Sequence, residues 1–226
     1  MREIVFDTET TGLSPNDGHR IFEIGMVEMV NRLPTGKTFH HFIDPEQEIS
    51  AESTRITGIT NDQVRGKPIF KDILDDLLNF IQNDPLVAHN AGFDMSFLNY
   101  EIERCNYTLP TNSVVDTLQL ARKKIPGARH SLDALCKRFN VALHAERDVH
   151  GALLDAQLLA EVYVELTGGL QGSLILDQQK KTKERSVMFQ KASITRSPLV
   201  LKPTEEEAKN HQTWLSKLPK SLWESS

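Results

Sequence analysis

Two acidic residues, Asp7 and Glu9, stand two positions apart in the apolar run from Ile4 to Glu9. The run is typical of a strand, and alternate residues of a strand point to the same side of the sheet, so both carboxylates should share a face with Val5. Two like charges roughly 6 to 7 Å apart on a buried strand are unfavourable without a counter-charge. A divalent cation is the simplest remedy. The alternative is a strand end whose acids reach solvent.

Two further acids, Asp94 and Asp155, occupy positions next to predicted apolar elements. Asp94 closes the segment HNAGFD at 89–94, just after the short apolar strand 86–88. Its alternative role is that of an acid favoured by the dipole of the following helix. Asp155 falls on the apolar stripe of a predicted helix at 152–166, and this stripe carries no Lys or Arg to pair with it. A partly exposed position at the stripe edge is the alternative there.

His150 precedes Asp155 by five positions, an offset of about 140° on a regular helix. We therefore expect His150 in the entry to the helix, over the site, with Asp148 capping the helix. A neutral imidazole beside metal ions suits a general base near pH 7, although a surface histidine is the alternative. Four acids and one His from a strand, a strand-to-helix junction and the start of a final helix favour one shared site.

The elements that must hold these residues alternate between strands and helices up to Gly168-Gly169. A mixed sheet with helices packed on it, an α/β domain, is therefore expected. Pro34-Thr35-Gly36 is predicted to separate the two strands of a hairpin. The predicted strands are 4–9, 21–30, 38–43 and 86–88, and the predicted helices are 70–81, 93–102, 117–122, 131–139 and 152–166.

Composition bounds the class of protein. The chain has 226 residues, of which 39% are hydrophobic, enough for a sizeable core. No apolar run approaches the roughly 18 to 20 residues that span a bilayer, and the N-terminus lacks the apolar stretch of a secretory signal. Two cysteines, Cys105 and Cys136, provide neither a disulfide framework nor a zinc cluster. We expect a cytoplasmic protein with no membrane partner.

The net charge of −5 argues, by itself, against a nucleic-acid partner. The charge is unevenly spread, however. Residues 1–169 hold 16 basic and 25 acidic side chains, a net of −9, whereas residues 170–226 hold 10 and 6, a net of +4. A divalent cation bound to the acids of the body would offset part of that charge, so the acidity does not by itself exclude a ligand that carries phosphate.

Three segments resemble the exonuclease motifs of the DEDDh 3′–5′ exonucleases: FDTETTG at 6–12, HNAGFD at 89–94 and HGALLD at 150–155. They are most similar to those of the epsilon proofreading subunits of bacterial DNA polymerase III. The resemblance implies a ribonuclease-H-like fold, with a mixed five-stranded sheet flanked by helices and a flexible C-terminal tail. It also implies a two-metal mechanism with Mg²⁺ or Mn²⁺ that releases nucleoside 5′-monophosphates from single-stranded or frayed DNA 3′ ends.

The same resemblance assigns roles to residues. Asp7, Glu9 and Asp155 would hold one ion, Asp7 and Asp94 would serve the second, and His150 would take a proton from the attacking water. The chain departs from the family at Ile56-Thr57-Gly58-Ile59, where the family often has Val-His-Gly-Ile, so the contact from Thr57 is the one in question. The implied substrate contacts are Asp7, Thr8, Glu9, Thr10, Gly12, Glu52, Thr57, His89, Asn90, Phe93 and Asp155.

A basic cluster lies in the second half of the body and either contacts DNA phosphates or forms a solvated surface. Its members are Arg122, Lys123, Lys124, Arg129, Lys137 and Arg138.

The C-terminal quarter is expected to bind proteins. By resemblance, residues 1–169 form the exonuclease domain, 170–193 a clamp-binding motif and flexible linker, and 194–226 a polymerase-binding tail. A helix is predicted over 205–215, capped by Thr204. The implied partners are the sliding clamp, the polymerase III alpha subunit and a further small core subunit. The expected anchors are Gln171, Leu174 and Leu176 for the clamp, and Trp214, Leu215, Leu218 and Trp223 for the polymerase.

Two other hypotheses compete with a proofreading subunit. A stand-alone exonuclease acting on DNA or RNA ends would need neither clamp nor polymerase anchors, so the tail argues against it. A non-catalytic scaffold would not need the complete set of Asp7, Glu9, Asp94, His150 and Asp155.

Overall fold

The computed structural model describes residues 1–141, 149–168 and 203–217. The chain divides into two compact units, residues 1–180 and 181–226, and each is described by itself. The predicted domain boundary after residue 169 lies outside the described residues and stays a prediction. No helix in the described ranges is long and apolar enough to cross a membrane.

The first unit is built on a five-stranded mixed sheet with the order β3-β2-β1-β4-β5. The first three strands pair antiparallel, whereas β4 and β5 run parallel to β1. This confirms the predicted α/β class and the mixed five-stranded sheet. The strands are β1 (Arg2–Thr10), β2 (Ile21–Val30), β3 (Leu33–Phe42), β4 (Leu86–Ala88) and β5 (Val114–Asp116).

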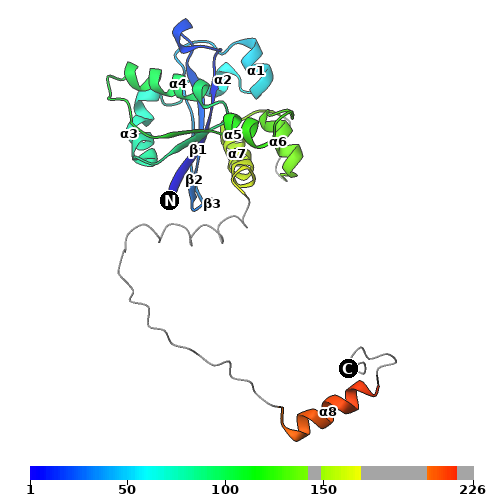
Figure 1. Cartoon of the computed structure of the whole chain (residues 1–226). Helices are drawn as coiled ribbons and strands as arrows, with labels where there is room; N and C mark the ends of the chain where they lie inside the picture. Colours follow the sequence, from blue (N-terminus) through cyan, green and yellow to red (C-terminus); the bar gives the residue numbers. More distant parts are fainter. Residues whose placement is uncertain (142–148, 169–202, 218–226) are drawn as a thin grey trace. The chain divides into compact units, whose positions relative to one another are not determined.

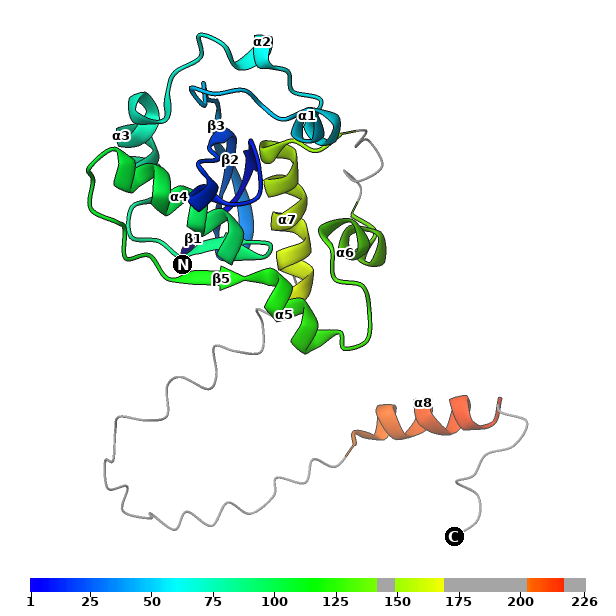
Figure 2. The same cartoon turned by 90° about the horizontal axis from the view of Figure 1, so that it is seen from above.

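Helices cover both faces of this sheet, with α3 and α4 on one side and α5, α6 and α7 on the other (Figures 1 and 2). Alternation along β1 explains the two layers, because Ile4 and Phe6 pack into the core on the α3–α4 side, whereas Val5 packs against α7. The helices of this unit are η1 (Pro15–Asp17), α1 (Ala51–Thr57), α2 (Asn61–Val64), α3 (Phe70–Ile81), α4 (Ala91–Arg104), α5 (Thr117–Lys124), α6 (Leu132–Phe139) and α7 (Ala152–Leu166).

The β2–β3 hairpin turns at a different place from the one predicted. Asn31 and Arg32 both have positive φ, 53° and 69°, and they connect the strands directly. Pro34-Thr35-Gly36 lies within β3, beside a register shift, so its prediction as the turn was wrong. Arg32 is held in this conformation by an ion pair with Glu3 and by stacking on the ring of Tyr163.

The predicted helices exist, with modest shifts at their ends. The sequence interpretation missed α1, α2 and β5, which are short. The N-cap residue of α7 is Gly151, and Asp148, the residue expected to cap this helix, lies outside the described residues.

The described part of the second unit contains α8 (Glu205–Leu215). The hydroxyl of Thr204 accepts a hydrogen bond from the backbone N–H of Glu207, as the sequence predicted, and the Glu207 carboxylate accepts from the backbone N–H of Thr204.

Candidate active site

The strand β1 presents Asp7 and Glu9 on the face that α7 covers. Both side chains are half-buried, and their cross-strand partners on β2 are Gly25 and Glu23. Val5 on the same face is fully buried in the cluster that contains α7. The predicted placement of the two carboxylates on one face is therefore confirmed.

Asp94 reaches the site from the first turn of α4, next to β1. The side chain is 3% exposed, and its Oδ1 accepts hydrogen bonds from the backbone N–H of Thr8 at 3.1 Å and from its hydroxyl at 2.8 Å. Asn90, the N-cap residue of α4, adopts a left-handed conformation with φ 65°. This turn connects the end of β4 to the helix that carries Asp94.

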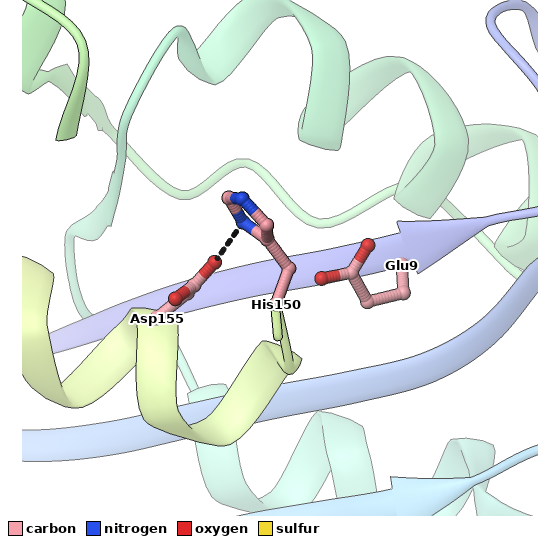
Figure 3. Close-up of side chains that lie close together, drawn as sticks. All are labelled: Glu9, His150 and Asp155. Carbon is pink, nitrogen blue, oxygen red and sulfur yellow. Dashed lines mark hydrogen bonds and ion pairs between the residues drawn. The ribbon is translucent and has the colours of Figure 1, made fainter. Parts of the chain in front are cut away.

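The start of α7 supplies Asp155 and His150. Asp155 is 4% exposed, and its Oδ2 lies 3.0 Å from Nδ1 of His150, which precedes the N-cap residue as expected. The backbone N–H of His150 donates to the carbonyl of Ile56 at 3.2 Å, so α1 holds this segment. Figure 3 shows the His150 imidazole above Asp155, with the Glu9 carboxylate beside them.

These side chains form a candidate cation site. One ligand atom from each of Glu9, His150 and Asp155 lies within 4.8 Å of the others. The carboxylate oxygens of Glu9 and Asp155 suit Mg²⁺ or Mn²⁺, and the imidazole of His150 lies beside them. The donor set therefore fits the divalent cations that the sequence implied.

The electrostatics of the site also favour a cation. Burial, followed by the charges of Asp94, Glu9, Asp155 and Glu23, raises the pKa of Asp7 well above its usual value. Burial likewise raises the pKa of Asp94 to about 7, although the hydrogen bonds from Thr8 act in the opposite direction. These acids therefore repel one another when ionised, and a bound cation would remove that repulsion.

Several predicted substrate-contact residues lie along the end of β1. The hydroxyl of Thr8 is buried and donates to Asp94, and that of Thr10 donates to the carbonyl of Gly12 at 2.7 Å. A Cβ on Gly12 would collide with the ring of His19, so a larger residue at this position would require that side chain to move. Thr8 and Thr10 thus use their hydroxyls to shape the site.

The remaining predicted contacts differ in accessibility. Glu52, in the first turn of α1, and Asn90 are exposed, and Phe93 is half-buried with its ring 5.0 Å from that of Phe97. Thr57 is 4% exposed and its hydroxyl donates to the carbonyl of Ser53, so it serves the end of α1. His89 Nδ1 lies 2.9 Å from the hydroxyl of Thr117, at the start of α5.

The expected protein anchors are only partly described. Trp214 on α8 is 60% exposed and Leu215 is half-buried. Gln171, Leu174, Leu176, Leu218 and Trp223 lie outside the described residues.

The basic cluster follows α5, the segment after it and α6. All six cations are exposed, and among the described residues none of them forms an ion pair.

Sequence reasoning missed Glu23, a buried carboxylate of β2 that contacts the start of α7. Its Oε2 accepts from the backbone N–H of Ala152 at 3.1 Å, and its Oε1 lies 2.7 Å from Nε2 of His40. The available signal was an acid between Phe22 and Ile24, inside a strand that is otherwise apolar.

Comparison with known proteins places this geometry in a family. A protein-family model described as "Exonuclease" matches residues 4–163. The DNA polymerase III subunit epsilon of Rickettsia felis is 45% identical, over 98% of this chain and 98% of the relative. That of Salmonella typhimurium is 41% identical, over 98% of this chain and 97% of the relative. The chain belongs to the epsilon subunit family. It is accordingly a 3′–5′ exonuclease.

Solved structures agree with the fold of this epsilon family member. Exonuclease X in complex with 5′ overhanging duplex DNA is 26% identical, with a TM-score of 0.58 over 73% of this chain and 90% of that chain. The nuclease domain of 3′hExo, a DEDDh family member bound to rAMP, is 20% identical, with a TM-score of 0.63 over 73% of this chain and 90% of that chain. The latter similarity supports the fold alone.

Proposed function

We propose that the chain proofreads DNA synthesis by hydrolysing the 3′-terminal phosphodiester of single-stranded or frayed DNA and releasing nucleoside 5′-monophosphates. The observation that carries this proposal is the convergence of Glu9, His150 and Asp155 within 4.8 Å, at the side of Asp7. Membership of the epsilon subunit family supports the substrate and the replicative context.

The carboxylates would hold two divalent cations, Mg²⁺ or Mn²⁺. We assign Asp7, Glu9 and Asp155 to one ion, and Asp7 and Asp94 to the other. When bound, such cations activate water as a nucleophile and stabilise the attacking and leaving oxygens of an in-line displacement. Asp94 is itself oriented by its two hydrogen bonds from Thr8, so β1 would fix both its own carboxylates and that of α4.

His150 would act as the general base. In the neutral tautomer that donates from Nδ1 to Asp155, Nε2 keeps its lone pair and can accept a proton from the attacking water. The side chain is 44% exposed, which leaves the imidazole accessible to substrate and water.

Substrate contacts are proposed for residues at the edge of the site. Glu52 and Asn90 are exposed and Phe93 is half-buried, and we include Gly12, two residues beyond β1, among the proposed contacts. The basic cluster of α5 and α6 would bind backbone phosphates. We make no such assignment for Thr57, because its hydroxyl is buried within α1.

The chain would work in the cytoplasm, at the replication fork, as a subunit of the replicative polymerase. Residues 170–193 would bind the sliding clamp through Gln171, Leu174 and Leu176. Residues 194–226 would bind the polymerase alpha subunit through Trp214, Leu215, Leu218 and Trp223. The exposure of Trp214 supports an anchor of this kind, since aromatic side chains dominate interface hot spots.

A digestion assay tests the proposal. Single-stranded, paired and mispaired 3′ ends of DNA and RNA are incubated with the chain in Mg²⁺, Mn²⁺ or EDTA. We expect metal-dependent release of nucleoside 5′-monophosphates, faster from single-stranded and mispaired DNA than from paired DNA. The double variant Asp7→Ala, Glu9→Ala should be inactive, and retained activity would refute the assigned site. Equal degradation of RNA would favour a stand-alone exonuclease.

A further inference from the structure

Two residues of β2 lie directly opposite the two candidate metal ligands of β1. Gly25 pairs with Asp7, and Glu23 pairs with Glu9. Directly opposite residues of an antiparallel pair project to the same face of the sheet. The side chain of Glu23 and the bare backbone of Gly25 therefore face α7, the helix that carries Asp155.

Glu23 is buried, and both of its oxygens are engaged. Only 3% of the residue is exposed, while Oε1 faces His40 at 2.7 Å and Oε2 accepts from Ala152 at 3.1 Å. A carboxylate removed from water is tolerated only with such partners. Because its oxygens are engaged by His40 and Ala152, Glu23 is not assigned as a metal ligand. Its interactions point to a different task.

That task concerns the first turn of α7, which receives no side-chain hydrogen bond from its own N-cap residue. The N-cap residue is Gly151, which has no side chain to accept a hydrogen bond from the helix. Glu23 supplies the acceptor from a neighbouring strand, and its negative charge lies at the positive end of the helix dipole. The beginning of α7 is thus tied to β2 by a charge-assisted hydrogen bond.

Gly25 allows the same turn to approach the sheet. A Cβ at this position would collide with the backbone of Ala152 and Leu153, so the helix start lies directly on the strand. The approach places Asp155, which follows Ala152 by three residues, on the face that carries Asp7 and Glu9.

We infer that Glu23 is a positioning residue for catalysis: supported by His40 and by the close approach at Gly25, it fixes the first turn of α7 and so sets Asp155 and His150 against the β1 carboxylates. The inference rests on the proposed metal site. Removing a group that hydrogen-bonds to the metal ligands or orients them typically lowers metal affinity or activity by about 10- to 100-fold.

The test compares Glu23→Ala, Glu23→Gln and His40→Ala in the full chain. Mn²⁺ binding is measured by calorimetric titration without substrate, and kcat and KM are measured on a single-stranded oligonucleotide. We expect Glu23→Ala to weaken Mn²⁺ binding by about 10- to 100-fold and to lower kcat with little change in KM. His40→Ala should have the same effect in a milder form. Glu23→Gln should recover most of the affinity, because an amide oxygen still accepts from Ala152.

Glu28→Ala is the matched control, since Glu28 is a second buried carboxylate of β2 whose partners are Arg2 and Thr35. It should lower the melting temperature without changing Mn²⁺ affinity. Equal losses of affinity in Glu28→Ala and Glu23→Ala, or normal Mn²⁺ binding and turnover in Glu23→Ala, would overturn the inference.

Two further variants keep the outcome decisive. If Glu23→Ala does not fold, Glu23→Asp carries the test, because it withdraws the carboxylate from Ala152 by one methylene. Wild-type Mn²⁺ affinity in both Glu23→Asp and His40→Ala would overturn the inference. Asp155→Asn distinguishes failure of the proposed metal site from failure of the positioning role of Glu23. Unchanged Mn²⁺ binding in this variant refutes the metal site itself, whereas loss there with normal binding in the Glu23 variants refutes only the positioning role.

Discussion

Asp94 shows how single residues of the site oppose stability in the absence of metal. Burial raises its carboxyl pKa to about 7 from an ordinary value of 3.8, so the folded chain favours the protonated acid. Ionisation of Asp94 therefore opposes folding. The penalty is absent below about pH 4, grows as the pH rises toward 7, and is complete above that.

We predict that Asp94→Asn stabilises the metal-free chain at pH 8 and has little effect at pH 4. Each pKa unit corresponds to about 1.4 kcal/mol, so the gain should raise the melting temperature by several degrees in EDTA. Asparagine keeps an oxygen that can accept from Thr8. The same variant should lose exonuclease activity. Thermal melts across this pH range check the prediction.

A control of opposite sign is available in Glu28. Hydrogen bonds from Arg2 and Thr35 lower the pKa of this carboxyl to about 2, so its ionised form stabilises the fold. That contribution is present above about pH 4.5 and is lost as the pH falls toward 2. Glu28→Gln should therefore lower the melting temperature at pH 8. A rise in that variant would contradict the electrostatic account of both residues.

His150 is expected to affect chemistry more than metal binding. We predict that His150→Ala lowers kcat by about 10²- to 10⁴-fold, the usual contribution of a general base. Mn²⁺ affinity should change much less, because Asp7, Glu9 and Asp155 remain. Single-turnover rates and metal titrations on one preparation check this, and unchanged turnover would remove the assigned role.

At the scale of elements, the basic cluster of α5 and α6 makes a separate prediction. Lys123→Ala combined with Lys124→Ala should weaken binding to single-stranded DNA and flatten its salt dependence. The slope of log K against log salt should fall by about 0.7 for each phosphate that the protein no longer neutralises. Lys67→Ala removes an exposed cation outside the cluster and serves as the control. Equal slopes in both variants would show that the cluster is a solvated surface.

Elements with strong periodicity were predictable from the sequence, and those fixed by tertiary contacts were not. The apolar stripe of α3 identifies this helix directly, whereas α7 stands out as a long apolar segment that is buried on several faces. The hairpin turn was misplaced because Pro34 and Gly36 carry the local turn signal. The real turn depends on Arg32, whose positive φ is supported by Glu3 and Tyr163. Neither partner is close to Arg32 in sequence.

The candidate site divides in the same way. Residue type and spacing left a structural alternative for each of Asp7, Glu9, Asp94, His150 and Asp155. The resemblance of the three motifs that contain them is what singled out the set. Glu23 could not be predicted, because its role depends on a hydrogen bond from Ala152, which lies 129 positions away in the sequence. The resemblance left a substrate contact from Thr57 in question, and the hydroxyl of Thr57 donates to the carbonyl of Ser53 within α1.

At the scale of the whole molecule, residues 194–226 should be separable from catalysis. We predict that their deletion leaves exonuclease activity on single-stranded ends intact, because the proposed site lies entirely in the first unit. Association with the polymerase alpha subunit should be lost on co-purification. Trp214→Ala in the full chain offers a milder version, and undiminished association in both proteins would refute the docking proposal.

The helix α7 also determines where a tether can pull. Its first turn carries Asp155, and the chain leaves its other end at Leu166 toward residues 170–226. Eleven residue steps of 1.5 Å each separate Asp155 from Leu166 by about 16 Å. A force applied through residues 170–226 would therefore enter the domain at the end of α7 that lies away from Asp155. If residues 194–226 bind a polymerase, a pull through them is applied away from Asp155 and the side chains that converge with it.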